Sequence, residues 1–307
     1  MSTGAGFPPS RPRRHWMMLS GADVHWVDFG GPATPQAMLV CVHGLNGSTV
    51  NWEGWGPLLT DRFRVVALDL VGHGSTRPGT RSATVAANAE LVSEFVDAIR
   101  PAGAPVVLVG SSMGGLISAY AAAGRADIAG LVLVNAALPR PGRVPPMAEL
   151  ARLALYSVPP IGRANAWGRR RFRTPEQLVN DLFRLCMRDV SVVDQELFRR
   201  HVEAAERRAR HPELDPYFAQ AAQSTVLCLA APRVRQVYAR VRAPVLMVHG
   251  THDRVIAYTA AQAAADRYPW WTFVTAHGGG HAPMLDNPAW LARVVTEWLD
   301  RVPTRDA

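Results

Sequence analysis

The sequence contains no lysine, so all 33 basic residues are arginines. This absence excludes Schiff-base chemistry and a P-loop nucleotide site, because both need a lysine ammonium group. Cysteine is scarce as well, and the three that occur are widely spaced without any CxxC pair: Cys41, Cys186 and Cys228. They indicate neither a disulfide framework nor a zinc site, and they fit a reducing compartment.

Long hydrophobic runs are also missing. No run approaches the roughly 18 apolar residues that a membrane span requires. After Arg13 and Arg14, the apolar stretch from Trp16 to Leu19 is too short for the hydrophobic part of a signal peptide. We therefore expect a soluble, cytoplasmic protein without integral membrane association.

The formal net charge of +8 is concentrated in one segment. Residues 139–240 hold 18 arginines against 10 acidic residues, whereas the rest of the chain is balanced. A basic excess raises nucleic acid or an anionic membrane as a partner. Because no nucleic-acid-binding motif accompanies the arginines, we interpret the segment as a solvated basic surface and expect no nucleic-acid partner. A binding face for an acidic substrate, a lipid or a nucleic acid is the alternative.

What the sequence does contain is an alternation of apolar strands and amphipathic helices. After an irregular start, short runs that stop at glycine or polar residues predict strands at 22–30, 37–44, 63–74, 104–110, 128–135, 243–250 and 270–276. The first of these is expected to be half-exposed. Apolar residues at three- and four-residue steps predict helices at 84–100 and 288–299. This pattern is typical of an α/β fold with a mostly parallel, doubly wound sheet.

One stretch interrupts this alternation. Residues 139–235 contain no comparable strand and only Pro-punctuated helical segments, such as 174–190 and 194–211. We therefore predict a core formed by residues 1–138 and 236–307, with a helical cap inserted at 139–235. Because ligands of open α/β sheets bind beyond the carboxyl ends of the strands, such a cap would cover the site.

A G-x-S-x-G motif follows the predicted strand at 104–110. In "GSSMG", Ser112 occupies the central position and Ser111 the variable one. A strand that passes into a helix within one residue holds its nucleophile in a strained conformation, which requires small neighbours such as Gly110 and Gly114. The turn is thus predicted to display Ser112 and to place the Met113 N–H beside it, at the positive end of a helix.

A serine nucleophile needs a base and an acid that orients the base. His281 lies in a glycine-rich loop after the last predicted strand, and Asp253 follows the strand at 243–250, in the chain order Ser, Asp, His. His277 is the rival base. Asn135 ends another strand where an acid could stand, but an amide cannot stabilise an imidazolium by its charge.

An anion-stabilising pocket needs two backbone donors. Met113 supplies one N–H, and the turn "VHGLNGS" is expected to supply the other from Leu45, with His43 in a structural role. Two sets of side chains are the alternative metal-ligand candidates: His249 and His252 with Asp253, or His277 with His281. The three glycines at 278–280 cannot hold histidines on a helix face, and no metal motif occurs, so neither a metal nor another cofactor is expected.

Five motifs together carry a family resemblance: "HGLNGS", "DLVGHGST", "GSSMGG", "HGTHD" and "GGGHAPMLDNP". In this order they resemble the α/β-hydrolase family with a helical cap, over about residues 20–138 and 240–300. The resemblance implies a triad of Ser112, Asp253 and His281, with Leu45 and Met113 as oxyanion donors. Family members that open epoxides or displace halide carry aspartate at the nucleophile position, where this chain has Ser112.

These residues predict a serine hydrolase of the esterase or lipase type that cleaves a small-molecule ester through an acyl-enzyme. We expect a small to medium apolar substrate that contacts Trp52, Leu150, Leu153 and Tyr156, although packing within the core or the cap is the alternative for each of them. An acyltransferase, a hydrolase of carbon–carbon bonds and a ligand-binding protein without turnover are alternatives on the same scaffold.

Overall fold

The structure, a computed structural model, describes residues 12–139 and 173–302. At its centre is an eight-stranded sheet in the order β1-β2-β4-β3-β5-β6-β7-β8. The strands are β1 (Arg13–Leu19), β2 (Ala22–Gly30), β3 (Met38–Val42), β4 (Arg64–Leu68), β5 (Val106–Ser111), β6 (Ile128–Val134), β7 (Val245–Gly250) and β8 (Thr272–Ala276). β2 pairs antiparallel with β1 and with β4, and every other pairing is parallel. The predicted mostly parallel α/β fold is confirmed.

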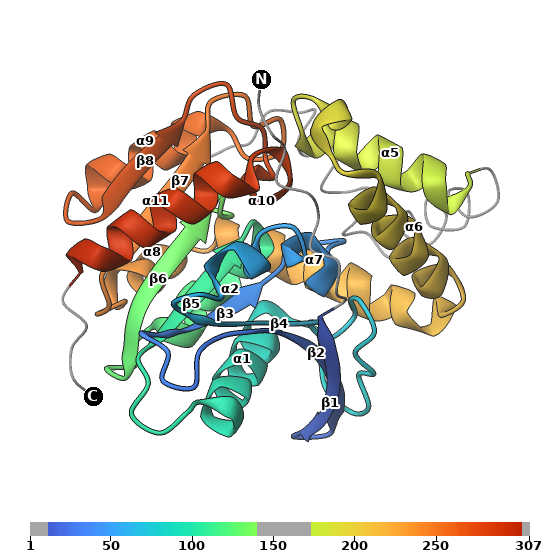
Figure 1. Ribbon diagram of the computed structural model, residues 1–307, viewed down its shortest axis with the longest axis horizontal. Helices are drawn as coiled ribbons and strands as arrows, with labels where there is room; N and C mark the ends of the chain where they lie inside the picture. Colours follow the sequence, from blue (N-terminus) through green and yellow to red (C-terminus); the bar gives the residue numbers. More distant parts are fainter. Residues whose placement is uncertain (1–11, 140–172, 303–307) are drawn as a thin grey trace.

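The sheet separates two buried cores, because successive side chains of a strand point to opposite faces. In β3, Met38, Val40 and Val42 join one core, and Leu39 and Cys41 join the other. The first core includes side chains of α1 (Val85–Ile99), α2 (Met113–Ala122), α8 (Val234–Ala239) and α9 (Tyr258–Arg267). The second includes side chains of α10 (Pro283–Asp286) and α11 (Pro288–Arg301). Figure 1 shows these helices arranged around the sheet. Helices therefore cover both faces, as predicted.

Two expectations for the first strands are wrong. The start of the chain is not irregular throughout, because Arg13–Leu19 forms β1 and pairs with β2 along its whole length. Nor is β2 half-exposed, since Val24 and Val27 are fully buried in opposite cores. β1 lies at the edge of the sheet with four of its seven residues exposed, which is why its sequence has no buried-strand pattern.

In its described part, the chain between β6 and β7 forms helices joined by short irregular segments and adds no strand to the sheet. It forms α5 (Pro175–Cys186), α6 (Gln195–Ala209) and α7 (Asp215–Ala230) before α8. α5 and α6 lie where helices were predicted, and they pack on each other beside the sheet (Figure 1). The predicted border at residues 235 and 236 lies inside α8, and the division into a core and a cap stays a prediction. In the described ranges, no helix is long and apolar enough to cross a membrane.

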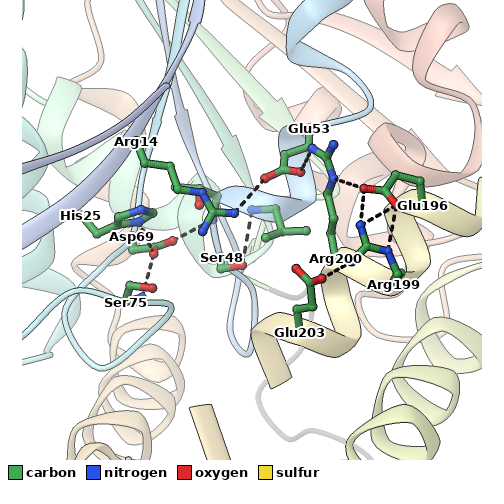
Figure 2. A network of polar contacts seen from close by, with 12 residues as sticks. Arg14, His25, Ser48, Glu53, Asp69, Ser75, Glu196, Arg199, Arg200 and Glu203 are labelled. Carbon is green, nitrogen blue, oxygen red and sulfur yellow. Dashed lines mark hydrogen bonds and ion pairs between the residues drawn. The ribbon is translucent and has the colours of Figure 1, made fainter. Parts of the chain in front are cut away.

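A buried ion pair attaches α6 to the sheet (Figure 2). The Arg200 guanidinium donates to Glu53 Oε2 over 2.7 Å, and the two side chains are only 5% and 1% exposed. Glu53 follows the short 3-10 helix η1 (Thr49–Trp52), and its other oxygen lies 3.9 Å from Arg14 of β1. Arg200 also donates to Glu196 on its own helix. One carboxylate therefore connects α6 to a loop of the core and to the edge strand.

Candidate active site

The turn between β5 and α2 is built around Ser112. This residue has φ 54°, in the left-handed region that few residues other than glycine adopt, and it caps the N-terminus of α2. Ser112 is half-buried, whereas Ser111 is buried. A Cβ on Gly110 would lie 2.4 Å from the carbonyl oxygen of Gly114, so the turn closes only with glycine there. The strained turn predicted from the motif is present, and it exposes Ser112 rather than Ser111.

Asp253 and His281 meet directly. His281 Nδ1 lies 2.7 Å from Asp253 Oδ2, and Asp253 itself is fully buried. Because the carboxylate is an acceptor, His281 Nδ1 carries the proton and donates it, which leaves Nε2 with a lone pair. The histidine is therefore oriented as a general base.

The remaining contacts of Asp253 hold it ionised. Its Oδ1 accepts hydrogen bonds from the backbone N–H groups of Val255 and Ile256, at 2.7 and 2.9 Å. Burial pushes the pKa of Asp253 up, but the charge of His281 and the hydrogen bonds from His281 and Asn135 outweigh it and hold the pKa below its usual value. An ionised Asp253 can stabilise an imidazolium at position 281.

Ser112 is connected to this pair through the segment that follows β6. Ser112 N donates to Val134 O over 3.1 Å, and Ala137 N donates to Ser112 O over 2.9 Å. Between these two residues, the Asn135 amide donates to Asp253 Oδ2. All three predicted triad residues therefore lie at the carboxyl end of the sheet, and one four-residue segment contacts the turn of Ser112 and the side chain of Asp253.

The turn after β3 lies against Ser112. A Cβ on Gly44 would be 2.8 Å from Ser112 Cβ and 3.4 Å from its Oγ. His43 Nε2 accepts a hydrogen bond from Leu70 N, so His43 Nδ1 carries the proton and donates it to Gly44 O over 2.8 Å. In a trans peptide the C=O and the following N–H point in opposite directions, so the Leu45 N–H is directed away from His43. The geometry favours the structural role expected for His43.

Met113, the other predicted oxyanion donor, is the first residue of α2. The first N–H groups of a helix lack intrahelical acceptors and carry the positive end of the helix dipole. Beneath the neighbouring turn, burial lowers the pKa of His43, so the imidazole stays neutral. Ser112 thus lies between the turn after β3, whose His43 imidazole is neutral, and the N-terminus of α2.

The rival residues lie differently. His277 is exposed, which separates it from the buried His281. His252 is also exposed and contacts the Thr251 hydroxyl. Across residues 12–139 and 173–302, no cluster of three or more His, Cys, Asp or Glu side chains could hold a metal ion.

Of the predicted substrate-lining residues, only Trp52 falls in the described ranges. It is fully buried beside Trp55 in one of the two cores, so it offers no surface to a substrate in this conformation. Leu150, Leu153 and Tyr156 lie outside the described residues. The lining of a substrate pocket therefore stays a prediction.

Sequence reasoning missed two neighbours of Asp253. Asn135 was weighed only as a place for an alternative acid, and His249 only as a metal ligand. His249 Nε2 lies 3.4 Å from Asp253 Oδ2 and 3.0 Å from Ile256 O, and burial lowers the pKa of His249. The signal for Asn135 was its position directly after a buried parallel strand, where side chains meet those of the neighbouring strand ends.

Comparisons with known proteins agree with this architecture. The acetyltransferase component of the acetoin cleaving system of Cupriavidus necator is 36% identical over 104 residues, 34% of this chain but only 26% of that protein. The monoacylglycerol lipase ABHD6 of Homo sapiens is 20% identical, over 95% of this chain and 86% of its own length. This chain therefore spans about a quarter of the first relative and most of the second.

Solved structures agree over nearly the whole chain. A membrane phospholipase A, described as a bacterial virulence factor, superposes with a TM-score of 0.74 and 24% identity, over 96% of this chain and 87% of its own. The epoxide hydrolase CorEH reaches a TM-score of 0.72 at 18% identity, over 94% and 99% of the two chains. These similarities show the fold alone. A model of the alpha/beta hydrolase family matches residues 39–294, so this chain belongs to that family.

Proposed function

We propose that the protein is a serine hydrolase that cleaves a small to medium apolar carboxylic ester. Ser112 would be the nucleophile, His281 the general base and Asp253 the acid that orients it. The Leu45 and Met113 N–H groups would bind the oxyanion. The observation that carries this proposal is the 2.7 Å hydrogen bond between His281 Nδ1 and a buried, ionised Asp253, next to a serine held at positive φ.

The reaction follows from these positions. His281 Nε2 takes the Ser112 proton as Oγ attacks the ester carbonyl carbon, and the carbonyl oxygen becomes an anion in the field of the two N–H groups. Collapse of this intermediate breaks the bond to the alkoxide, which receives the proton from His281. Water, deprotonated by His281, then attacks the acyl-enzyme carbonyl. The bond to Ser112 Oγ breaks, His281 returns the proton to Ser112, and the carboxylic acid is released.

The ester class is supported by what the relatives are called. One is a monoacylglycerol lipase, and another solved structure of similar fold is a thermophilic esterase from Thermogutta terrifontis. A serine at position 112 argues against epoxide chemistry on this chain, even though an epoxide hydrolase shares the fold. Fold alone does not select among these reactions, so the residues of the site decide.

The test is hydrolysis of a panel of p-nitrophenyl esters of increasing acyl length. Ser112→Ala is expected to abolish turnover, and Ser111→Ala, the matched control, to keep it within about twofold of wild type. Full activity in Ser112→Ala would remove Ser112 from the mechanism. No turnover of any ester by the wild type would reject the ester class.

An acyltransferase is the second candidate. The local match to an acetyltransferase component favours it, although that match covers about a third of this chain. Product analysis with added alcohol and thiol acceptors separates the two: a hydrolase gives only the free acid, whereas a transferase gives the acylated acceptor.

A further inference from the structure

Asn135 joins the two loops that carry Asp253 and His281. Its Nδ2 donates to Asp253 Oδ2 over 2.7 Å and to Gly280 O, immediately before His281, over 3.1 Å. A carboxamide nitrogen has two hydrogens, and both acceptors are oxygens. Asn135 therefore uses its whole donor capacity on the acid and on the backbone next to the base.

The backbone of Asn135 is fixed as tightly as its side chain. Asn135 N donates to Val248 O of β7 over 2.8 Å, and φ is 45°, a left-handed value that asparagine tolerates better than most residues. The residue is fully buried, and its Oδ1 has no hydrogen-bond partner among the described residues. A buried amide that leaves its oxygen unpaired is unfavourable for folding alone. The orientation is selected by the two donated bonds.

Other hydrogen bonds also join these two loops: His252 N donates to Gly279 O and Gly278 N donates to Thr251 Oγ1, each over 2.9 Å. Neither of them reaches the carboxylate of Asp253. His249 on β7 approaches the same carboxylate oxygen at 3.4 Å, while its closer contact is the carbonyl of Ile256. The backbone donors of Val255 and Ile256 act on the opposite carboxylate oxygen and come from the loop of Asp253 itself. Among the hydrogen bonds of the described residues, the Asn135 amide thus combines a bond to the Asp253 carboxylate with a bond to the backbone immediately before His281.

We propose that Asn135 is a positioning residue that keeps Asp253 and His281 in register with each other and with the turn of Ser112. The catalytic relevance of this register rests on the proposed function. Asn135 does not reach substrate. It acts by fixing the carboxylate oxygen that His281 uses and the peptide from which His281 extends.

Two variants test this role. Asn135→Gly removes the amide and keeps the backbone conformation, because glycine adopts positive φ freely. Asn135→Asp keeps the shape but replaces the two donors with a carboxylate that faces two acceptors. We expect kcat for a p-nitrophenyl ester at pH 8 to fall about 10-fold to 100-fold in Asn135→Gly and to fall further in Asn135→Asp. KM should stay within about twofold of the wild-type value in both variants.

A matched control and a second readout complete the experiment. Ser20→Gly replaces another residue with positive φ, in the exposed turn before β2, and should leave kcat unchanged. By NMR, the Nδ1–H of His281, assigned with a His281→Gln variant, should exchange with water at least about tenfold faster in Asn135→Gly. This proton reports on the register even if no ester is cleaved.

The outcomes are separable. If kcat and the proton exchange rate stay at wild-type values in both variants, Asn135 is structural only and the proposal is overturned. If the wild type has no Ser112-dependent activity, the proposed function fails, and the exchange rate alone decides the role of Asn135.

Discussion

Polar side chains are fixed by different contacts at the strand ends of the sheet and on α6, which lies between β6 and β7. At the strand ends, apolar strands buried on both faces fix the backbone, and short hydrogen bonds then align the polar side chains. α6 also buries Leu197 in one of these cores, but its polar attachment is the buried pair of Arg200 and Glu53, and its surface carries exposed pairs such as Arg199 with Glu196 (Figure 2).

This comparison indicates which contacts fix the geometry of the site. Side chains on rigid strand ends keep their geometry because moving them would disturb a close-packed core. A buried ion pair contributes less net stability, because desolvation opposes its Coulomb attraction. Removal of one partner is nevertheless destabilising, because it leaves a buried charge with less compensation. Substitutions at the strand ends should thus change mainly kcat, and substitutions in the ion pair that attaches α6 should change mainly the free energy of unfolding.

The largest effect is expected at the base. His281→Gln should lower kcat about 10⁴-fold or more, because the variant removes the general base of the proposed triad. His277→Gln changes an exposed histidine only four residues earlier and should leave kcat within about twofold. Steady-state ester hydrolysis measures both. Equal losses in the two variants would contradict the assignment.

The buried ion pair should produce the next effect, in stability. Glu53→Gln removes the buried carboxylate that pairs with Arg200, leaves Arg200 with the more exposed Glu196, and should lower the free energy of unfolding by about 3 kcal/mol. The control is Asp300→Asn, which removes the charge from the exposed pair with Arg62 and should change stability far less than Glu53→Gln does. Urea unfolding followed by circular dichroism gives both values. Equal small losses would show that α6 does not depend on Glu53.

A smaller effect is expected at the turn beside Ser112. Gly44→Ala would put a methyl group 2.8 Å from Ser112 Cβ, so the turn must move and its N–H donor with it. We expect kcat to fall about 10-fold to 100-fold with little change in the midpoint of thermal unfolding. In Gly54→Ala, the nearest atom is the flexible end of Leu197 at 3.2 Å, so its kcat should change less than about twofold.

The smallest effect concerns Asp286, whose carboxylate accepts a hydrogen bond from Gly280 N in the His281 loop. Burial raises the pKa of Asp286 to about 6. Because the folded state holds this proton more tightly than the unfolded state, stability is highest below the unfolded pKa and falls as the pH rises through about 6.

Asp286→Asn should remove that loss and stabilise the protein at pH 8 by about 1 kcal/mol, after allowance for its partial exposure. Unfolding midpoints from pH 4 to pH 8 measure the effect. A variant less stable than the wild type at pH 8 would show that the charge of Asp286 is favourable.

The same contrast explains what the sequence alone could predict. Buried parallel strands are continuous apolar runs, and in this sequence the G-x-S-x-G motif follows one of them. The sheet and the position of Ser112 could therefore be predicted from local sequence patterns. β1 was not predicted, because its apolar stretch from Trp16 to Leu19 is short and follows the exposed arginines Arg13 and Arg14. The contacts of Asn135 with Asp253 and of Glu53 with Arg200 join residues 118 and 147 positions apart. Only the folded chain reveals such pairs.

The most direct test of the central claim is to find which atom a fluorophosphonate probe modifies. Peptide mass spectrometry after labelling should place the adduct on Ser112, with Ser111 unmodified, and His281→Gln should suppress the labelling. An adduct on Ser111, or equal labelling of wild type and Ser112→Ala, would contradict the account.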